Sequence, residues 1–187
     1  MKLNLKTTSG RGANPILGFT LPETLVGVAV GVLALTSLML IFLTSNRSFV
    51  AMGNYVNLDQ TSRLAVEQMT RDIRNAQNLT SFSTNQLVFA FSGTNNLVYT
   101  YNPSSATLTS WITGGTTNTL LTGCDWLQFS MFNNSPQPGA TMTNATTVGQ
   151  AKAVSVAWRS SRAILGSKVN TENMQEATIV IRNKPVQ

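Results

Sequence analysis

The hydropathy pattern of the chain changes twice along its length, from a uniformly apolar segment to a helical period and then to a period of two. Residues 24–46 carry no charged side chain, and residues 25–43 (LVGVAVGVLALTSLMLIFL) are almost entirely apolar. A helix rises about 1.5 Å per residue, so the uncharged run is about 35 Å long and exceeds the roughly 30 Å hydrocarbon core of a bilayer. The pattern predicts a membrane-spanning helix over residues 19–46 that ends before Arg47.

Residues 47–79 change to an amphipathic helical pattern. Proline and glycine are absent from residues 54–78, and apolar positions recur there at spacings of three, four and seven, which predicts a helix with one face packed on a β-sheet. The apolar face consists of Leu58, Ala65, Met69, Ile73 and Ala76. The opposite face alternates in charge through Asp59, Arg63, Glu67 and Arg71. Such i,i+4 pairs stabilise a helix, so the charged face is either a solvated surface or a surface for subunit recognition.

Beyond Leu79 the apolar residues recur at every second position, as they do in half-buried β-strands. Thr, Ser, Asn and aromatic residues are frequent there, and polar turns separate the runs. The expected strands are residues 86–92, 97–101, 107–112, 125–132, 151–158 and 177–182, with a weaker one at 119–121. We therefore expect an α+β fold in which a long N-terminal helix packs on an antiparallel β-sheet formed by residues 80–187.

Two segments between these strands, residues 133–150 and 160–175, are expected to be loops. The first is rich in Asn, Thr, Pro and Gly, and a loop of its length in a small domain is either flexible or functional. It is therefore a candidate for contact with a partner. Cys124 is the single cysteine, so it forms no internal disulfide, and we expect it to be a small buried apolar residue.

The composition excludes several classes of function. Histidine is absent, which removes the commonest general base, the Ser-His-Asp triad and imidazole metal ligands. The net charge of +6 includes Lys2, Lys6 and Arg11, and the remainder of the chain holds ten Lys and Arg against seven Asp and Glu. No strong basic patch remains, so we expect no direct binding of nucleic acid. No catalytic residue, metal ligand or cofactor is indicated.

A short motif precedes the apolar segment. Gly18-Phe19-Thr20-Leu21-Pro22-Glu23 follows a basic leader. Glycine lets an extended backbone enter a peptidase cleft, and Pro22 suits a first helical turn because amides there have no intrahelical partner. A secretory signal has a shorter apolar stretch than this chain, and a plain signal anchor leaves Glu23 unexplained.

This motif resembles the processing site of type IV prepilins. The resemblance implies that residues 1–18 form a leader whose basic residues stay in the cytoplasm, and that prepilin peptidase cuts between Gly18 and Phe19. It also implies methylation of the new amine of Phe19. Glu23 then stands at the fifth mature position, where the family uses a glutamate to pair with the amine of an adjacent subunit during assembly.

The remainder of the chain resembles PilW-like minor pilins and J-type minor pseudopilins of type II secretion. Residues 63–76 (RLAVEQMTRDIRNA) match their helical segment, which often reads R-x-x-x-x-x-M-x-R-D-I-R-x-A. Residues 120–129 and 180–183 match later strands. The resemblance makes the helix a possible subunit contact through Arg63, Glu67, Arg71, Asp72 and Arg74.

Together these resemblances imply a non-enzymatic assembly subunit. Its expected partners are prepilin peptidase, other pilin or pseudopilin subunits, the inner-membrane assembly platform and membrane lipid. The chain is then a single-pass inner-membrane protein with a cytoplasmic N-terminus and an external globular domain. It later enters a pilus or pseudopilus, where the resemblance implies a place in an initiating or tip complex. The alternatives are a major structural or adhesive pilin, a competence pseudopilin, and a membrane-tethered enzyme. The enzyme would need a site built from Asp59, Glu67, Asp72, Asp125, Glu172 and Glu176.

Overall fold

The computed structural model describes residues 18–91, 93–137, 139, 141–165 and 170–182. The chain forms two compact units, Met1–Thr44 and Ser45–Gln187. Helix α1 (Leu21–Asn75) supplies the described helical residues of the first unit and the first element of the second. Among the described residues, the remaining elements are strands β1–β8 and one short 3₁₀ helix, η1 (Val148–Gln150). A long N-terminal helix followed by antiparallel strands confirms the α+β class.

The described part of the first unit is apolar and exposed. Its most apolar 18-residue window has a mean hydropathy of 2.6 and contains no buried residue, and the helix is long and apolar enough to cross a membrane. The hydroxyl groups within this segment bond to the helix itself. Ser37 Oγ donates to the carbonyl oxygen of Leu33 at 2.9 Å and Thr44 Oγ1 to that of Leu40 at 2.8 Å. These hydroxyls therefore need no water, which makes them compatible with an apolar environment.

In the second unit, α1 buries one face. The residues of α1 that are buried are Leu58, Ser62, Ala65, Met69 and Ile73. They follow the predicted apolar stripe, and Ala76 is buried just after the helix ends. The helix is shorter than the expected 47–79 segment because the backbone leaves it for a sheet: Gln77 N–H donates to the carbonyl oxygen of Ala90 at 2.8 Å.

The first sheet has five antiparallel strands in the order β1-β2-β3-β4-β5. They are β1 (Asn78–Ser83), β2 (Gln86–Ala90), β3 (Asn96–Asn102), β4 (Thr107–Ile112) and β5 (Asn118–Thr122). The last four were expected from the sequence. Strand β1 was missed because its pairing with β2 shifts register between Leu79 and Ser81, so buried and exposed positions do not alternate regularly along it.

The second sheet has three antiparallel strands, so the expectation of a single sheet is wrong. The order is β6-β7-β8, with β6 (Cys124–Phe132), β7 (Ala153–Ala163) and β8 (Asn170–Val180). The expected loop over residues 160–175 is also wrong, because β7 and β8 pair there, for example Ser161 with Glu172. Polar residues on the inner face of these strands, such as the buried Ser160 and Asn173, conceal the alternation.

The expected loop over residues 133–150 is confirmed in outline. Among its described residues, regular structure is limited to η1 and an isolated bridge between Phe132 and Asn144. Asn134 holds the base of the loop together. Its Nδ2 donates to the carbonyl oxygen of Thr141, and its Oδ1 accepts from the amide of Thr143, both at 3.0 Å.

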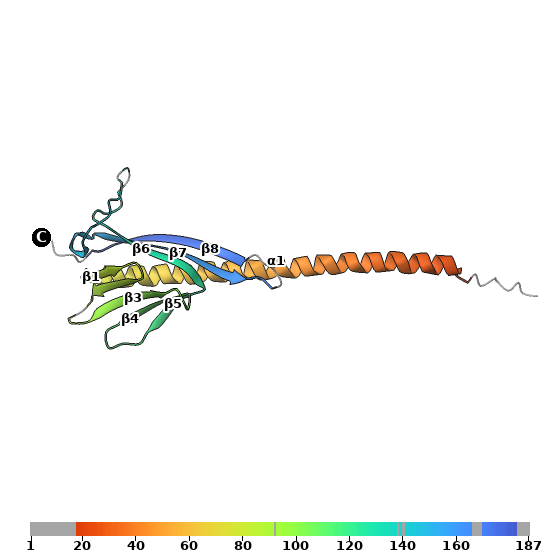
Figure 1. Cartoon of the computed structure of the whole chain (residues 1–187), viewed down its shortest axis with the longest axis horizontal. Coiled ribbons are helices and arrows are strands. Elements are labelled where there is room, and N and C mark those ends of the chain that lie inside the picture. Colours follow the sequence, from red (N-terminus) through yellow and green to blue (C-terminus); the bar gives the residue numbers. More distant parts are fainter. Residues whose placement is uncertain (1–17, 92, 138, 140, 166–169, 183–187) are drawn as a thin grey trace, which may run out of the picture. The chain divides into compact units, whose positions relative to one another are not determined.

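The core of the second unit joins α1 to both sheets. In the view of Figure 1, β6–β8 lie along one side of the C-terminal part of α1 and β3–β5 along the other. Trp158 on β7 is fully buried and donates from Nε1 to Ser62 Oγ at 3.3 Å. Cys124 is fully buried, as expected, and burial raises the pKa of its thiol to about 11. It is therefore an unreactive core residue at neutral pH.

Gly123 connects the two sheets between β5 and β6. Its φ is +70°, and its carbonyl oxygen accepts from the amide of Ser161 at 2.8 Å. A Cβ at this position would lie 2.8 Å from the carbonyl oxygen of Ser161. Both the left-handed backbone and the close approach of β7 therefore require glycine.

Three glycine-to-alanine variants separate these two requirements. Gly149→Ala, with open space and no positive φ, should change the free energy of unfolding by less than about 0.5 kcal/mol. Gly93→Ala has φ +64° but open space, so backbone strain alone should cost about 1 kcal/mol. Gly123→Ala adds the contact with Ser161 and should cost about 2–4 kcal/mol. Unfolding of the full chain in detergent, followed by tryptophan fluorescence, measures all three. Equal losses for Gly93→Ala and Gly123→Ala would contradict the role of the close approach.

Candidate functional site

The predicted processing site lies immediately before α1. Gly18, Phe19 and Thr20 are exposed and have no regular secondary structure. Phe19 is 80 % exposed, and among the described residues beyond its chain neighbours no heavy atom lies within 4 Å of the position of a Cβ on Gly18. The peptide bond between Gly18 and Phe19 is therefore accessible and outside the helix, as a peptidase substrate requires. The predicted leader residues Lys2, Lys6 and Arg11 lie outside the described residues.

Glu23 lies in the first turn of α1 and is exposed. A carboxylate is favourable at this end of a helix because the first amides have no intrahelical partners. Within residues 18–182 as far as they are described, no Lys or Arg lies within ion-pair distance of Glu23. Among the described residues, this carboxylate at the start of an apolar helix therefore forms no ion pair.

The predicted subunit-contact residues of α1 do not share one face. Arg63, Glu67, Arg71 and Arg74 are exposed. Arg63 Nε lies 2.8 Å from Asp59 Oδ2, so the predicted ladder of charges is formed at this step. Asp72 differs from the other four because it is half-buried and faces the five-stranded sheet.

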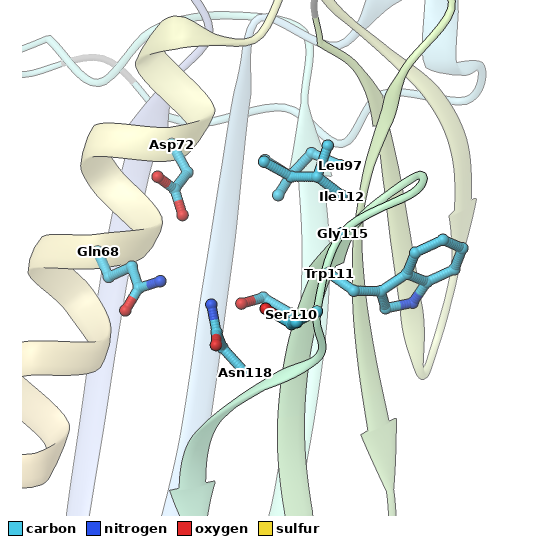
Figure 2. Close-up of a pocket in the computed structure, with 9 residues that line it drawn as sticks. Gln68, Asp72, Leu97, Ser110, Trp111, Ile112, Gly115 and Asn118 are labelled. Atoms are coloured by element: carbon cyan, nitrogen blue, oxygen red, sulfur yellow. The ribbon is translucent and has the colours of Figure 1, made fainter.

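Asp72 lines a cavity of about 260 Å³ between α1 and strands β3–β5. The hydroxyl group of Tyr99 on β3 donates a hydrogen bond to Asp72 Oδ2, with an oxygen–oxygen distance of 3.3 Å. Figure 2 shows Asp72 and Gln68 extending from the helix towards Ser110 and Asn118 on the strands. Polar atoms from two opposite walls therefore converge on one space.

Burial dominates the electrostatics of this cavity. The pKa of Asp72 is raised above its ordinary value by burial, although hydrogen bonds from Tyr99 and Gln68 and the charge of Arg71 oppose the shift. The pKa of Tyr99 is raised as well, mainly by burial and further by the neighbouring carboxylate. Tyr99 therefore stays protonated at neutral pH and acts as a hydrogen-bond donor.

The sequence contained a signal for this position that the charge pattern concealed. Asp72 follows Met69 by three residues and precedes Ile73 and Ala76 by one and four, so helical spacing places it at the edge of the buried face. Gln68 precedes it by four residues and belongs to the same edge. The strand residues of the cavity carry no such signal, because their position depends on how the sheet meets the helix.

The carboxylates of the enzyme alternative are dispersed. Asp125 lies 3.7 Å from Arg159 Nε, and Glu176 accepts a hydrogen bond from Ser155 at 3.2 Å. In the described part of the chain, no group of three or more His, Cys, Asp or Glu residues is placed to hold a metal ion. The carboxylates named for that alternative therefore do not form a metal cluster. No protein-family model, curated protein or solved structure matches this chain.

Asp72→Asn should stabilise the protein at neutral pH. Because the folded-state pKa of Asp72 is raised, the folded chain favours the protonated carboxyl. That contribution is complete below the ordinary pKa of aspartate and is lost as pH rises through the raised pKa. Asparagine stays neutral and can still accept from Tyr99, so we expect a gain of about 1 kcal/mol or less at pH 7 that vanishes near pH 3.

Asp59→Asn is the matched control on the same helix. It removes a partly exposed i,i+4 ion pair with Arg63 and should lower stability by about 0.3–0.5 kcal/mol. Chemical unfolding of both variants between pH 3 and pH 7 shows whether each substitution raises or lowers the free energy of unfolding. A loss of stability in Asp72→Asn at pH 7 would show that the carboxylate is net stabilising.

Proposed function

We propose that the chain is a minor subunit of a type IV pilus or a type II secretion pseudopilus. In this proposal, prepilin peptidase cleaves the chain after Gly18 and methylates Phe19. The chain then enters a filament through the apolar part of α1. The observation that carries the proposal is the motif from Gly18 to Glu23. Its first three residues are exposed and lie outside the helix, and the uncharged apolar segment of α1 follows Glu23 directly.

The exposed apolar surface of the first unit supports an assembly role. Nearly all of its large apolar side chains are more than half exposed, from Leu21 at 78 % to Phe42 at 62 %. Leaving such a surface in water is unfavourable by about 25 cal/mol for each Å². Lipid tails cover it before assembly, and the apolar helices of neighbouring subunits replace them in a filament by van der Waals packing.

Glu23 makes this assembly specific for one arrangement of the subunits. A carboxylate next to an apolar helix is costly unless a cation pairs with it. Cleavage after Gly18 creates a cation of suitable position, the amine of Phe19 on an adjacent subunit. The pairing sets the axial register between subunits, because only one stagger of two parallel helices brings these groups together.

The match of residues 63–76 to minor pilins and pseudopilins favours a minor role, in an initiating or tip complex. A major structural pilin and a competence pseudopilin share the N-terminal motif, so the abundance of the chain in isolated filaments separates the first of these from the proposal. A dominant subunit of sheared filaments would contradict a minor role.

The mass of the mature protein tests processing. We expect chain extracted from membranes to begin at Phe19 with one methyl group on its amine. Gly18→Val should prevent cleavage, because a branched side chain at the scissile position obstructs the extended backbone. Mass spectrometry of the intact chain and of its N-terminal peptide determines the first residue and the methylation state of the wild type and of Gly18→Val. A wild-type chain that begins at residue 1 or 2 in cells with active prepilin peptidase would contradict the proposal.

Glu23→Ala tests assembly separately from processing. We expect normal cleavage but incorporation into filaments reduced by more than about tenfold, because the amine of Phe19 loses its partner. Glu172→Ala is the matched control, since it removes an exposed carboxylate of β8 that is not among the predicted subunit-contact residues. Quantitative immunodetection in purified filaments, normalised to membrane-bound chain, measures both. Equal incorporation of the Glu23→Ala variant and the wild type would refute the role of Glu23.

A further inference from the structure

We propose that the cavity between α1 and strands β3–β5 is a docking site for a guanidinium group, presented by an arginine side chain of another protein. The inference rests on this cavity alone. It does not depend on the proposed function, because a chain that is never cleaved after Gly18 retains the same cavity.

Charge complementarity identifies the occupant as a cation. Asp72 is the one charged side chain among the described residues that line the cavity. Among the described residues, no Lys or Arg lies within ion-pair distance of it, and Arg71 next to it in sequence is exposed. A half-buried carboxylate without a cation is stabilised by a charged partner that displaces water from it.

The other polar groups favour a guanidinium. The amide groups of Gln68 and Asn118 and the hydroxyl of Ser110 lie around Asp72 on two facing walls (Figure 2). A guanidinium has five N–H donors in a plane and is weakly hydrated, so it can donate to both walls at once, whereas an ammonium is a strongly hydrated point charge with three donors. A divalent cation would find a single carboxylate here and no group of acidic ligands among the described residues.

The remaining lining accommodates the stem of the side chain. Leu97 and Ile112 provide an apolar wall, which suits the methylene groups of arginine. The volume of about 260 Å³ greatly exceeds the roughly 10–15 Å³ that a cavity needs to hold one water molecule. Gly115, Thr116 and Asn118 are exposed, so a side chain can enter from the connection between β4 and β5.

Tyr99 prepares the carboxylate for this partner. Its hydroxyl donates to Oδ2 at 3.3 Å, which holds the Asp72 side chain in one orientation and leaves acceptor capacity on both oxygens, because a carboxylate has about four lone-pair sites. Burial raises the pKa of Asp72, so an entering cation gains a less hydrated partner than an exposed carboxylate would be.

The binding experiment uses the full chain, labelled with ¹⁵N in zwitterionic detergent micelles. The probe is N-acetyl-arginine methylamide, and amide resonances of residues 110–118 report its binding. We expect saturable shifts with a dissociation constant of about 1–10 mM, as one side-chain contact provides. The neutral citrulline analogue and the lysine analogue should each bind at least about tenfold more weakly. Equal binding of either analogue, or no shift with the arginine probe at about 50 mM, would overturn the proposal.

Three variants assign the binding to the cavity. Asp72→Asn should weaken the arginine probe by at least about tenfold, and Asp59→Asn should leave its affinity unchanged. Asn118→Asp places a second carboxylate at the exposed edge of the cavity and should tighten binding by about threefold or more. This last variant tests the site by a gain of affinity and leaves Asp72 unchanged. Unchanged affinity in both Asp72→Asn and Asn118→Asp would place the probe elsewhere and refute the site.

Discussion

Burial of one face of α1 between the two sheets is the constraint on which the second unit depends. The buried residues of the helix recur at spacings of three and four, so their burial fixes the rotation of the helix about its axis. That rotation brings Ser62 to Trp158 of one sheet and Asp72 to Tyr99 of the other. It also directs Arg63 and Glu67 to solvent. The exposed charges and the lined cavity therefore follow from the same packing.

The apolar part of α1 presents the opposite situation, because its side chains are exposed. Its hydroxyl groups donate to carbonyl oxygens of the preceding turn, as Thr36 does to Val32 and Leu33, so the segment offers its surroundings an almost purely apolar surface. Such a surface specifies an apolar environment but no particular partner. In the proposed assembly, specificity must therefore come from the polar residue at its start, Glu23.

Sequence periodicity predicted the elements whose pattern arises from a single buried face. The stripe from Leu58 to Ala76, strand β4 and most of strand β6 followed from spacing alone. Periodicity failed where tertiary contacts hide it. Strand β1 contains a register shift, and the paired ends of β7 and β8 bury the polar Ser160 and Asn173. The division into two sheets depends on the turn at Gly123, where a local backbone conformation meets a neighbour distant in sequence.

The two candidate sites differ in the same way. Gly18, Phe19 and Glu23 form a contiguous motif, so the sequence alone predicts their role. The cavity combines residues from α1, β3, β4 and β5, and only Gln68 and Asp72 lie at a spacing that sequence analysis can recognise. Residues of the strands become neighbours of the helix through packing, which a linear pattern does not encode.

Glu23 and Asp72 nevertheless share one physical property. Each is a carboxylate that forms no ion pair among the described residues. The fold treats the two charges differently, because the N-terminus of a helix favours the exposed carboxylate of Glu23, whereas burial disfavours the charge of Asp72. A carboxylate that the fold leaves unpaired discriminates between partners, because a neutral or anionic partner leaves the desolvation cost uncompensated. In the proposed assembly, apolar packing supplies affinity along the helix and the charge of Glu23 sets the register, while the charge of Asp72 selects the proposed cationic partner.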